Sequence, residues 1–236
     1  VKAASWYHLS AEAGNAAAMC KLGLCYAKGT GVKRDAAEAV KWYRLAAKAG
    51  DTNAMSLLGY CYATGTGVKQ GDAEAVKLYR QAADAGDANA MCFLARCYAK
   101  GTAGIGRDNV EAIKWYRLAA EAGSVEAMVG LGVRYASGTG VGKDDAEATR
   151  WFRQAAEAGN TGAMFNLGLS YANGTGVEQD DAEAASWYRK ASEGGQAVAM
   201  VNLAACYANG TGISQDDAEA VKWYRKAAEA GSVDAM

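Results

Sequence analysis

The chain contains six cysteines and one histidine, the residue types most often used for disulfide, metal and nucleophilic chemistry. Cysteines five positions apart, such as Cys20 and Cys25, would point about 140° away from each other on a helix. No C-x-x-C pair occurs, so we expect small buried thiols, which favour a reducing, cytoplasm-like compartment. The six residues are Cys20, Cys25, Cys61, Cys92, Cys97 and Cys206.

Two other features resemble chemical sites only superficially. His8 is the single histidine and has no evident second ligand, so neither a metal site nor a histidine-based triad is predicted. The segment from Gly138 to Lys143 resembles a phosphate-binding loop, but its glycine spacing is one residue short and Asp144 stands where serine or threonine is required. We interpret the segment as a turn and predict no cofactor, no metal and no catalytic residue.

Charge and hydropathy exclude two classes of partner. The 25 lysine and arginine residues nearly balance the 26 aspartate and glutamate residues, which gives a formal net charge of −1. This balance provides no basic footprint for nucleic acid. Charged residues also recur too often for an apolar run of about 18 residues, so we expect no membrane span.

The elements that carry these side chains recur with a fixed period, which is the first property to establish in a sequence. Alanine precedes every methionine, and successive methionines are 36 residues apart except for one step of 37. Tryptophan keeps the same spacing, with Leu78 where one tryptophan is missing. The extra residue lies in the loop 101–106, which we predict to be a local bulge. The methionines are Met19, Met55, Met91, Met128, Met164, Met200 and Met236.

Residues 144–179 illustrate one repeat. Asp144 is predicted to cap a first helix, with Glu147 reaching back to complete a capping box. Gly159 ends that helix in a left-handed conformation, and Asn160 caps a second helix immediately afterwards. Exposed Arg153 and Glu157 form an i,i+4 pair of a kind that recurs along the chain.

The second helix of the repeat has a stripe of small and apolar residues. The position of Gly168 is glycine or alanine in every copy, which would let a bulky ring approach closely, and we expect Trp and Tyr of the first helix to fill it. In the loop that follows, Val177 is predicted to fold back as an apolar plug. Each repeat thus predicts two antiparallel helices that pack on each other.

This pattern resembles the Sel1-like repeat, a relative of the tetratricopeptide repeat. The residues that carry the resemblance are Ala163, Leu167, Gly168, Tyr171, Gly174, Gly176 and Val177, followed by Ala184, Trp187, Tyr188 and Ala191 in the next copy. It implies an all-α, right-handed superhelical solenoid of about six helix pairs and a non-catalytic protein-interaction scaffold. Some bacterial members have a disulfide between the two helices of a repeat, but here every cysteine falls on the second helix.

The repeats are predicted to form one array over residues 1–236. Val1 falls in the middle of a helix and Met236 just inside a new one, so we interpret the chain as a fragment cut within a repeat at both ends.

Positions that differ from copy to copy are the candidate binding residues. On the second helix they lie opposite the core stripe and are expected to line a concave groove. Leu57, Tyr60 and Phe93 would form an apolar pocket with a positive rim, and asparagines further along would pair with a peptide backbone. Random drift of exposed positions is the alternative. The predicted residues are Lys21, Leu57, Tyr60, Phe93, Arg96, Lys100, Asn166, Leu169, Asn173, Asn202 and Asn209.

The sequence therefore predicts a scaffold or adaptor that binds a protein or peptide. One alternative is the regulatory or docking arm of a larger enzyme or signalling protein whose catalytic domain lies elsewhere. An intrinsic hydrolase is disfavoured, because no serine or cysteine departs from the repeat pattern as a nucleophile and no suitable histidine accompanies one.

Overall fold

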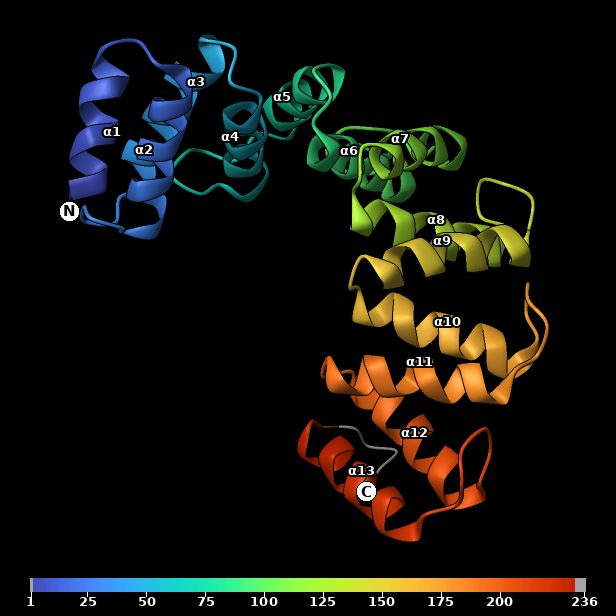
Figure 1. Cartoon of the computed structure of the whole chain (residues 1–236). Coiled ribbons are helices and arrows are strands. Elements are labelled where there is room, and N and C mark those ends of the chain that lie inside the picture. Colours follow the sequence, from blue (N-terminus) through green and yellow to red (C-terminus); the bar gives the residue numbers. More distant parts are fainter. Residues whose placement is uncertain (1, 232–236) are drawn as a thin grey trace. The chain divides into compact units, whose positions relative to one another are not determined.

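The computed structural model of the chain describes residues 2–231, and within that range the chain forms thirteen α-helices and no strand (Figure 1). The all-α repeat of helix pairs is confirmed. The interpretations placed on Val1 and Met236 lie outside the described residues. The helices are α1 (Lys2–Glu12), α2 (Ala16–Lys28), α3 (Ala36–Lys48), α4 (Thr52–Thr64), α5 (Asp72–Asp84), α6 (Ala88–Lys100), α7 (Asn109–Glu121), α8 (Val125–Ser137), α9 (Asp145–Glu157), α10 (Thr161–Asn173), α11 (Asp181–Glu193), α12 (Ala197–Asn209) and α13 (Asp217–Glu229).

The helices gather into two compact units, which are described separately. Unit 1 comprises residues 1–124 with α1 to α7, and unit 2 comprises residues 125–236 with α8 to α13. Within each unit every helix packs against the next helix in the sequence. The closest packing joins an even-numbered helix to the odd-numbered helix after it, across the glycine loop, as α10 packs on α11.

Aspartate caps begin five of the odd-numbered helices, as predicted. The carboxylate of Asp144 accepts a hydrogen bond from the backbone N–H of Glu147 at 2.9 Å. Gly71, which replaces the cap at α5, makes no side-chain bond. The predicted reverse bond of the capping box is replaced by an ion pair, since Glu147 pairs with Arg150 one turn further on. The five caps are Asp35, Asp108, Asp144, Asp180 and Asp216.

An aromatic ring packs into the small position of each of four even-numbered helices. A Cβ atom built on Gly23 would lie 2.6 Å from the Tyr43 ring, and one built on Gly59 would lie 3.1 Å from the Tyr79 ring. The equivalent partners in unit 2 are Gly132 with Phe152 and Gly168 with Tyr188. The expectation that tyrosine fills this position is correct. Tryptophan does not fill it, because it lies on a different side of the odd-numbered helix. Trp42 packs instead against the cluster that contains Leu22, and Trp187 packs against the cluster that contains Leu167.

A second contact joins four odd-numbered helices, α3, α5, α9 and α11, to the even-numbered helices that follow them. The guanidinium of Arg153 donates a hydrogen bond to the Tyr171 hydroxyl at 2.7 Å and lies over its ring. The arginine is therefore engaged with a neighbouring helix, whereas the sequence predicted an exposed pair with Glu157. The same bond joins Arg44 to Tyr62, Arg80 to Tyr98 and Arg189 to Tyr207.

The loops also behave largely as predicted. Val68 and its equivalents Ile105 and Ile213 are half-buried and pack against the core clusters of their helix pairs. In the longer loop after α6, the extra residue is accommodated at Ala103, which adopts a left-handed φ of 57°. Ile105 keeps its place in the core, so the insertion is confined to the loop.

The glycine contacts predict different tolerances to an added methyl group. Gly23→Ala should destabilise unit 1 by about 1–2 kcal/mol, because overpacking against the buried Tyr43 ring outweighs the roughly 0.5–1 kcal/mol that alanine gains in helix propensity. Gly59→Ala should be within about 0.5 kcal/mol of wild type, because the wider spacing to Tyr79 needs little adjustment. Thermal unfolding of both variants measures the difference, and equal losses of stability would contradict it.

Candidate binding faces on the even-numbered helices

The predicted binding residues divide between the two units. The unit 1 face consists of Lys21, Leu57, Tyr60, Phe93, Arg96 and Lys100 on helices α2, α4 and α6. The unit 2 face consists of Asn166, Leu169, Asn173, Asn202 and Asn209 on helices α10 and α12. Every one of these residues is exposed or half-buried, and none belongs to the fully buried core.

Three residues of the unit 1 face converge on one buried tyrosine. Tyr79 of α5 is only 5% exposed, and burial is the largest cause that raises its pKa. Tyr60 from α4 also raises the pKa of Tyr79, whereas the positive charge of Arg96 from α6 lowers it. Phe93 stacks on the Tyr79 ring, with centroids 3.8 Å apart and planes inclined by 21°. Phe93 thus lies against the face of the Tyr79 ring, and Tyr60 and Arg96 lie close enough to the Tyr79 hydroxyl to affect its pKa.

The three differ in how much surface they offer. Tyr60 is 57% exposed, which makes it one of the most exposed large hydrophobic residues of the chain. Phe93 is half-buried against the cluster of Ala75, Tyr79 and Leu94. Helical spacing in the sequence places Phe93 on the face opposite the core stripe. Its ring also packs against α5, because it stacks on Tyr79. Tyr60 is therefore the principal apolar contact that this face presents to solvent.

The remaining unit 1 residues surround this centre. Leu57 is half-buried and packs against the cluster of Cys20, Ala46 and Ala54, between α2 and α4. Lys21 on α2 is exposed, and so is Lys100 in the last turn of α6. Both cations lie on the helices next to the α3–α5 segment, Lys21 on α2 and Lys100 on α6.

Charge is distributed unevenly along these helices. Helices α2 and α6 carry Lys21, Lys28, Arg96 and Lys100, and α4 carries no charge, so the three helices hold four cations and no acid. The Asp51 and Asp87 carboxylates at the N-caps accept bonds from backbone N–H groups of α4 and α6. The acidic residues of this unit otherwise lie on the odd-numbered helices and loops.

The unit 2 face is uncharged. Helices α10 and α12 contain no lysine, arginine, aspartate or glutamate. Asn202 lies within hydrogen-bond reach of the Tyr188 hydroxyl, where it partly offsets the burial that raises the pKa of Tyr188. Leu169 packs against the cluster around Tyr188, whereas Asn173 and Asn209 are exposed at the ends of their helices.

Sequence reasoning missed the buried tyrosines of the odd-numbered helices as part of these faces. Tyr79 and Tyr188 read as core residues, and their rings are indeed buried. Their hydroxyl ends nevertheless lie beside the variable residues of α4, α6 and α12. The sequence signal was the repeated position of Gly59 and Gly168. A tyrosine ring that packs against a glycine reaches beyond the helix that carries the glycine.

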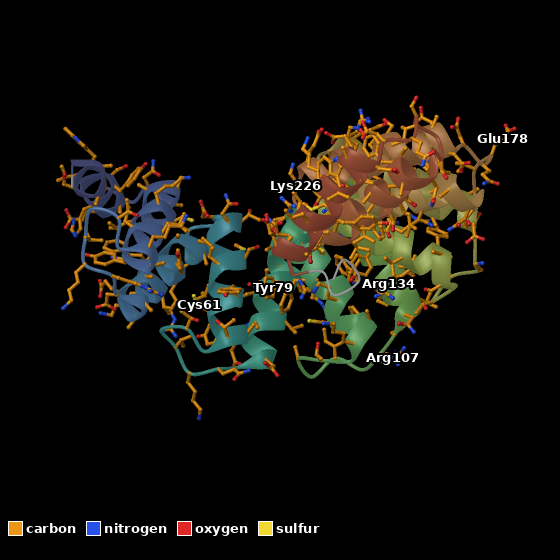
Figure 2. The ribbon with its side chains drawn as sticks, turned by 90° about the horizontal axis from the view of Figure 1, so that it is seen from below. Cys61, Tyr79, Arg107, Arg134, Glu178 and Lys226 are labelled. Atoms are coloured by element: carbon orange, nitrogen blue, oxygen red, sulfur yellow. The ribbon has the colours of Figure 1, made fainter. Side chains whose placement is uncertain are left out.

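The six cysteines are free thiols, and all are buried. Burial raises the pKa of Cys20 to about 12, helped by a hydrogen bond to Asp51. Burial also raises the pKa of Cys61, and Figure 2 labels this thiol on α4 beside the α5 residue Tyr79. Burial likewise raises the pKa values of Cys97 and Cys206. Because only the thiolate is nucleophilic, these side chains are inert small hydrophobes.

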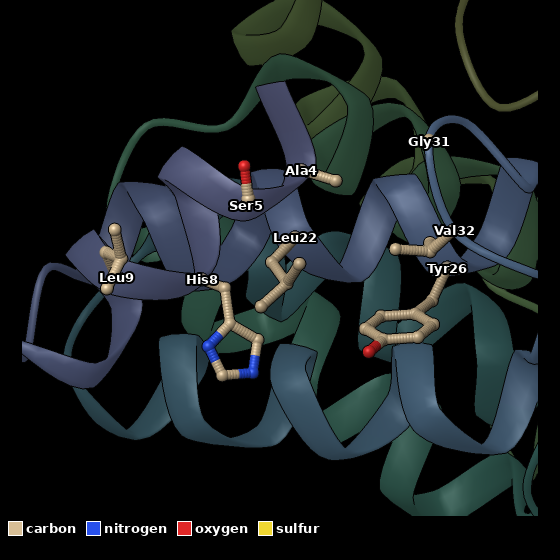
Figure 3. A pocket seen from close by; sticks show the side chains of 8 residues that line it. All are labelled: Ala4, Ser5, His8, Leu9, Leu22, Tyr26, Gly31 and Val32. Carbon is tan, nitrogen blue, oxygen red and sulfur yellow. The ribbon is translucent and has the colours of Figure 1, made fainter. Parts of the chain in front are cut away.

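A pocket of about 530 Å³ lies beside His8, between α1, α2 and the loop that follows (Figure 3). His8 takes the column of Arg44, pairs with Glu12 at 3.4 Å, and meets the Trp42 ring edge-on at 5.7 Å.

No group of three or more histidine, cysteine, aspartate or glutamate side chains within residues 2–231 is arranged to hold a metal ion. No helix in that range is long and apolar enough to cross a membrane.

The chain was compared with protein families and with known proteins. The Sel1 repeat model matches seven times, at residues 1–15, 16–51, 52–87, 88–124, 125–160, 161–196 and 197–232. The matches after the first begin at even-numbered helices, so Arg44 and Tyr62 belong to consecutive repeats. No curated protein sequence matches the chain.

Several solved structures are similar. A protective antigen present in uropathogenic Escherichia coli strains aligns with a TM-score of 0.93 and 37% identity over 98% of this chain. This chain spans 50% of the antigen's length. A Sel1 repeat protein from Oxalobacter formigenes aligns with a TM-score of 0.85 and 38% identity, covering 92% of this chain and 89% of its own. An immunity protein from Pseudomonas aeruginosa shares the fold at 20% identity and a TM-score of 0.55, covering 94% of this chain and 83% of its own.

The buried thiols predict a pH dependence of stability. The unfolded chain releases the Cys20 proton near its ordinary pKa of 9.0, whereas the folded chain retains it to about 12. Folding stability from this group is therefore complete below pH 9 and is lost as the pH rises towards 12. Urea unfolding at pH 8, 10 and 11 should show a falling midpoint.

Two measurements accompany that experiment. The variant Cys20→Ala should lose less stability than wild type over the same pH interval, because it has one proton fewer to retain. Iodoacetamide at pH 8 should label the folded chain far more slowly than the chain in urea, as read by mass spectrometry. Equal labelling in the two conditions would contradict the burial of the thiols.

Proposed function

The chain belongs to the Sel1 repeat family, whose proteins are generally protein-interaction scaffolds, and we propose that it is a non-catalytic scaffold that binds a peptide segment of a partner on the unit 1 face. The observation that carries the proposal is the composition of α2, α4 and α6. These three helices carry four cations and no acid, and Tyr60 on α4 is exposed.

The charge distribution indicates the chemistry of the partner. A peptide with acidic side chains would be attracted by Lys21, Arg96 and Lys100, although the chain as a whole is nearly neutral. The exposed cations act mainly on the rate and specificity of association, and salt screens them over about 8 Å at physiological ionic strength. We therefore propose an acidic segment with at least one apolar side chain.

The apolar side chain would contact Tyr60. Tyrosine and arginine are the residue types most often found at the energetic centre of an interface, and both Tyr60 and Arg96 lie close enough to the buried Tyr79 to affect its pKa. Stacking with Tyr79 holds the Phe93 ring in place, so this wall is ordered before a partner arrives. Leu57 extends the apolar surface towards α2.

The unit 2 face suits a different kind of contact. Its asparagines offer both a donor and an acceptor, the pair of groups that a peptide backbone presents. Helices α10 and α12 carry no charge, so this face would not select acidic side chains. We propose that Asn166, Asn173 and Asn209 bind backbone amides, with Leu169 beside them.

A second candidate function is a docking arm of a larger enzyme or signalling protein. This chain spans 50% of the length of the similar E. coli antigen. That difference in length is the observation that favours this second function. Binding experiments separate the two proposals. A scaffold captures its peptide with residues 1–236 alone, whereas a docking arm affects a reaction only when a catalytic domain is attached.

Panning the purified chain against a random peptide display library tests the first proposal. The selected peptides should be enriched in aspartate and glutamate next to an apolar residue. Tyr60→Ala should weaken a selected peptide about tenfold or more, as loss of a central tyrosine does at other interfaces. Arg96→Glu should weaken it further, and raising the salt concentration should reduce wild-type affinity. Fluorescence anisotropy measures each change.

The control is Leu45→Ala, which removes a side chain of similar exposure, 48%, from the odd-numbered helix α3. Its affinity should equal that of wild type. Phe93→Ala is a less direct test, because it also removes the stacking on Tyr79, so circular dichroism must accompany the Tyr60/Phe93 double variant. Peptides without acidic residues, or binding unchanged in Tyr60→Ala, would refute the assignment.

A further inference from the structure

One helix pair has a hollow where the other repeats have tryptophan. Leu78 of α5 occupies a column that is otherwise Trp6, Trp42, Trp115, Trp151, Trp187 and Trp223. Beside Leu78 lies an open pocket of about 340 Å³, with Arg44, Leu58 and Tyr62 among its walls. This volume is at the lower end of the range for small-ligand sites.

The equivalent walls in other repeats hold an indole ring. Trp42 packs against the cluster that contains Leu22 and Tyr26, with His8 edge-on to its ring. Trp187 packs against the cluster that contains Leu167 and Tyr171. Leu22 and Leu167 occupy the column of Leu58, and Tyr26 and Tyr171 occupy that of Tyr62. The pocket at Leu78 is therefore the position of an indole that the sequence does not supply.

Two polar groups that contact the indole of one other tryptophan, Trp151, have counterparts here. In α9, the Trp151 indole N–H donates to the Glu147 carboxylate at 3.0 Å, and the Arg150 guanidinium lies 5.1 Å from the ring centroid. Glu147 and Arg150 correspond to Glu74 and Lys77, and both of these line the pocket. Arg44 is held in place by its 3.0 Å bond to the Tyr62 hydroxyl.

We propose that this pocket binds a small molecule that carries an indole or a similar planar heteroaromatic ring with an N–H group. The ring would lie against Leu58, Leu78 and Tyr62, the N–H would donate to Glu74, and Lys77 would lie over the ring face. Apolar cavities left by a missing side chain bind aromatic molecules in other proteins. The site is independent of the unit 1 face, because it uses none of that face's residues.

Titrating the 236-residue chain with indole, observed by two-dimensional NMR, tests the proposal. The expected result is saturable binding of one indole, with shifts concentrated in α3, α4 and α5. Leu78→Trp should weaken this binding at least tenfold, because the added ring fills the pocket with the residue that the other repeats use. Circular dichroism verifies that this variant is folded.

A second ligand tests the role of Glu74. Wild type should bind indole about threefold to tenfold more tightly than 1-methylindole, which has no N–H to donate, since the lost bond ends on an exposed carboxylate. Glu74→Ala should remove that preference. A preference retained in Glu74→Ala would overturn the assignment of the acceptor.

The matched gain-of-function variant is Trp42→Leu, which opens the equivalent position next to Leu22 and Tyr26. If it remains folded, it should bind a second indole. Absence of saturable binding to wild type, unchanged affinity in folded Leu78→Trp, or a single site in folded Trp42→Leu would overturn the proposal.

Discussion

The contact on which this structure depends is an aromatic ring pressed against a helix that has no side chain at that point. Tyr43 lies against Gly23, and Tyr79 lies against Gly59, with the ring atoms as close as a bound Cβ would allow or closer. Without the Cβ, the even-numbered and odd-numbered helices of a pair approach closely enough to bury both the ring and a leucine. Repeating this contact determines how successive helices pack within each unit.

The same contact produces the candidate binding faces. Because the ring extends past its glycine, its hydroxyl end emerges beside the next even-numbered helix, where Arg96 and Asn202 lie near Tyr79 and Tyr188. A repeated core tyrosine thus lies beneath residues that vary between repeats. In the proposed binding faces, specificity would come from a few substitutions on a constant frame, with cations on α2 and α6 in unit 1 and asparagines on α10 and α12 in unit 2.

A substitution that breaks the repeat pattern carries more functional information than the pattern does. Leu78 is the single departure from tryptophan in its column, and it leaves an open pocket whose walls match those that hold Trp42 and Trp187. The residues that line this pocket come from α3, α4 and α5.

The sequence by itself determined the helices, their caps, the loops and the period, because these depend on interactions within about five residues and recur in every copy. It also identified Tyr60, Arg96 and the asparagines as variable, exposed positions. Only the tertiary structure decided that tyrosine rather than tryptophan fills the glycine position, that Arg153 bonds Tyr171 rather than Glu157, and that Phe93 stacks on Tyr79. These contacts join residues 14 to 20 positions apart on different helices, so they depend on how each helix is rotated against its neighbour, which helical spacing alone does not specify.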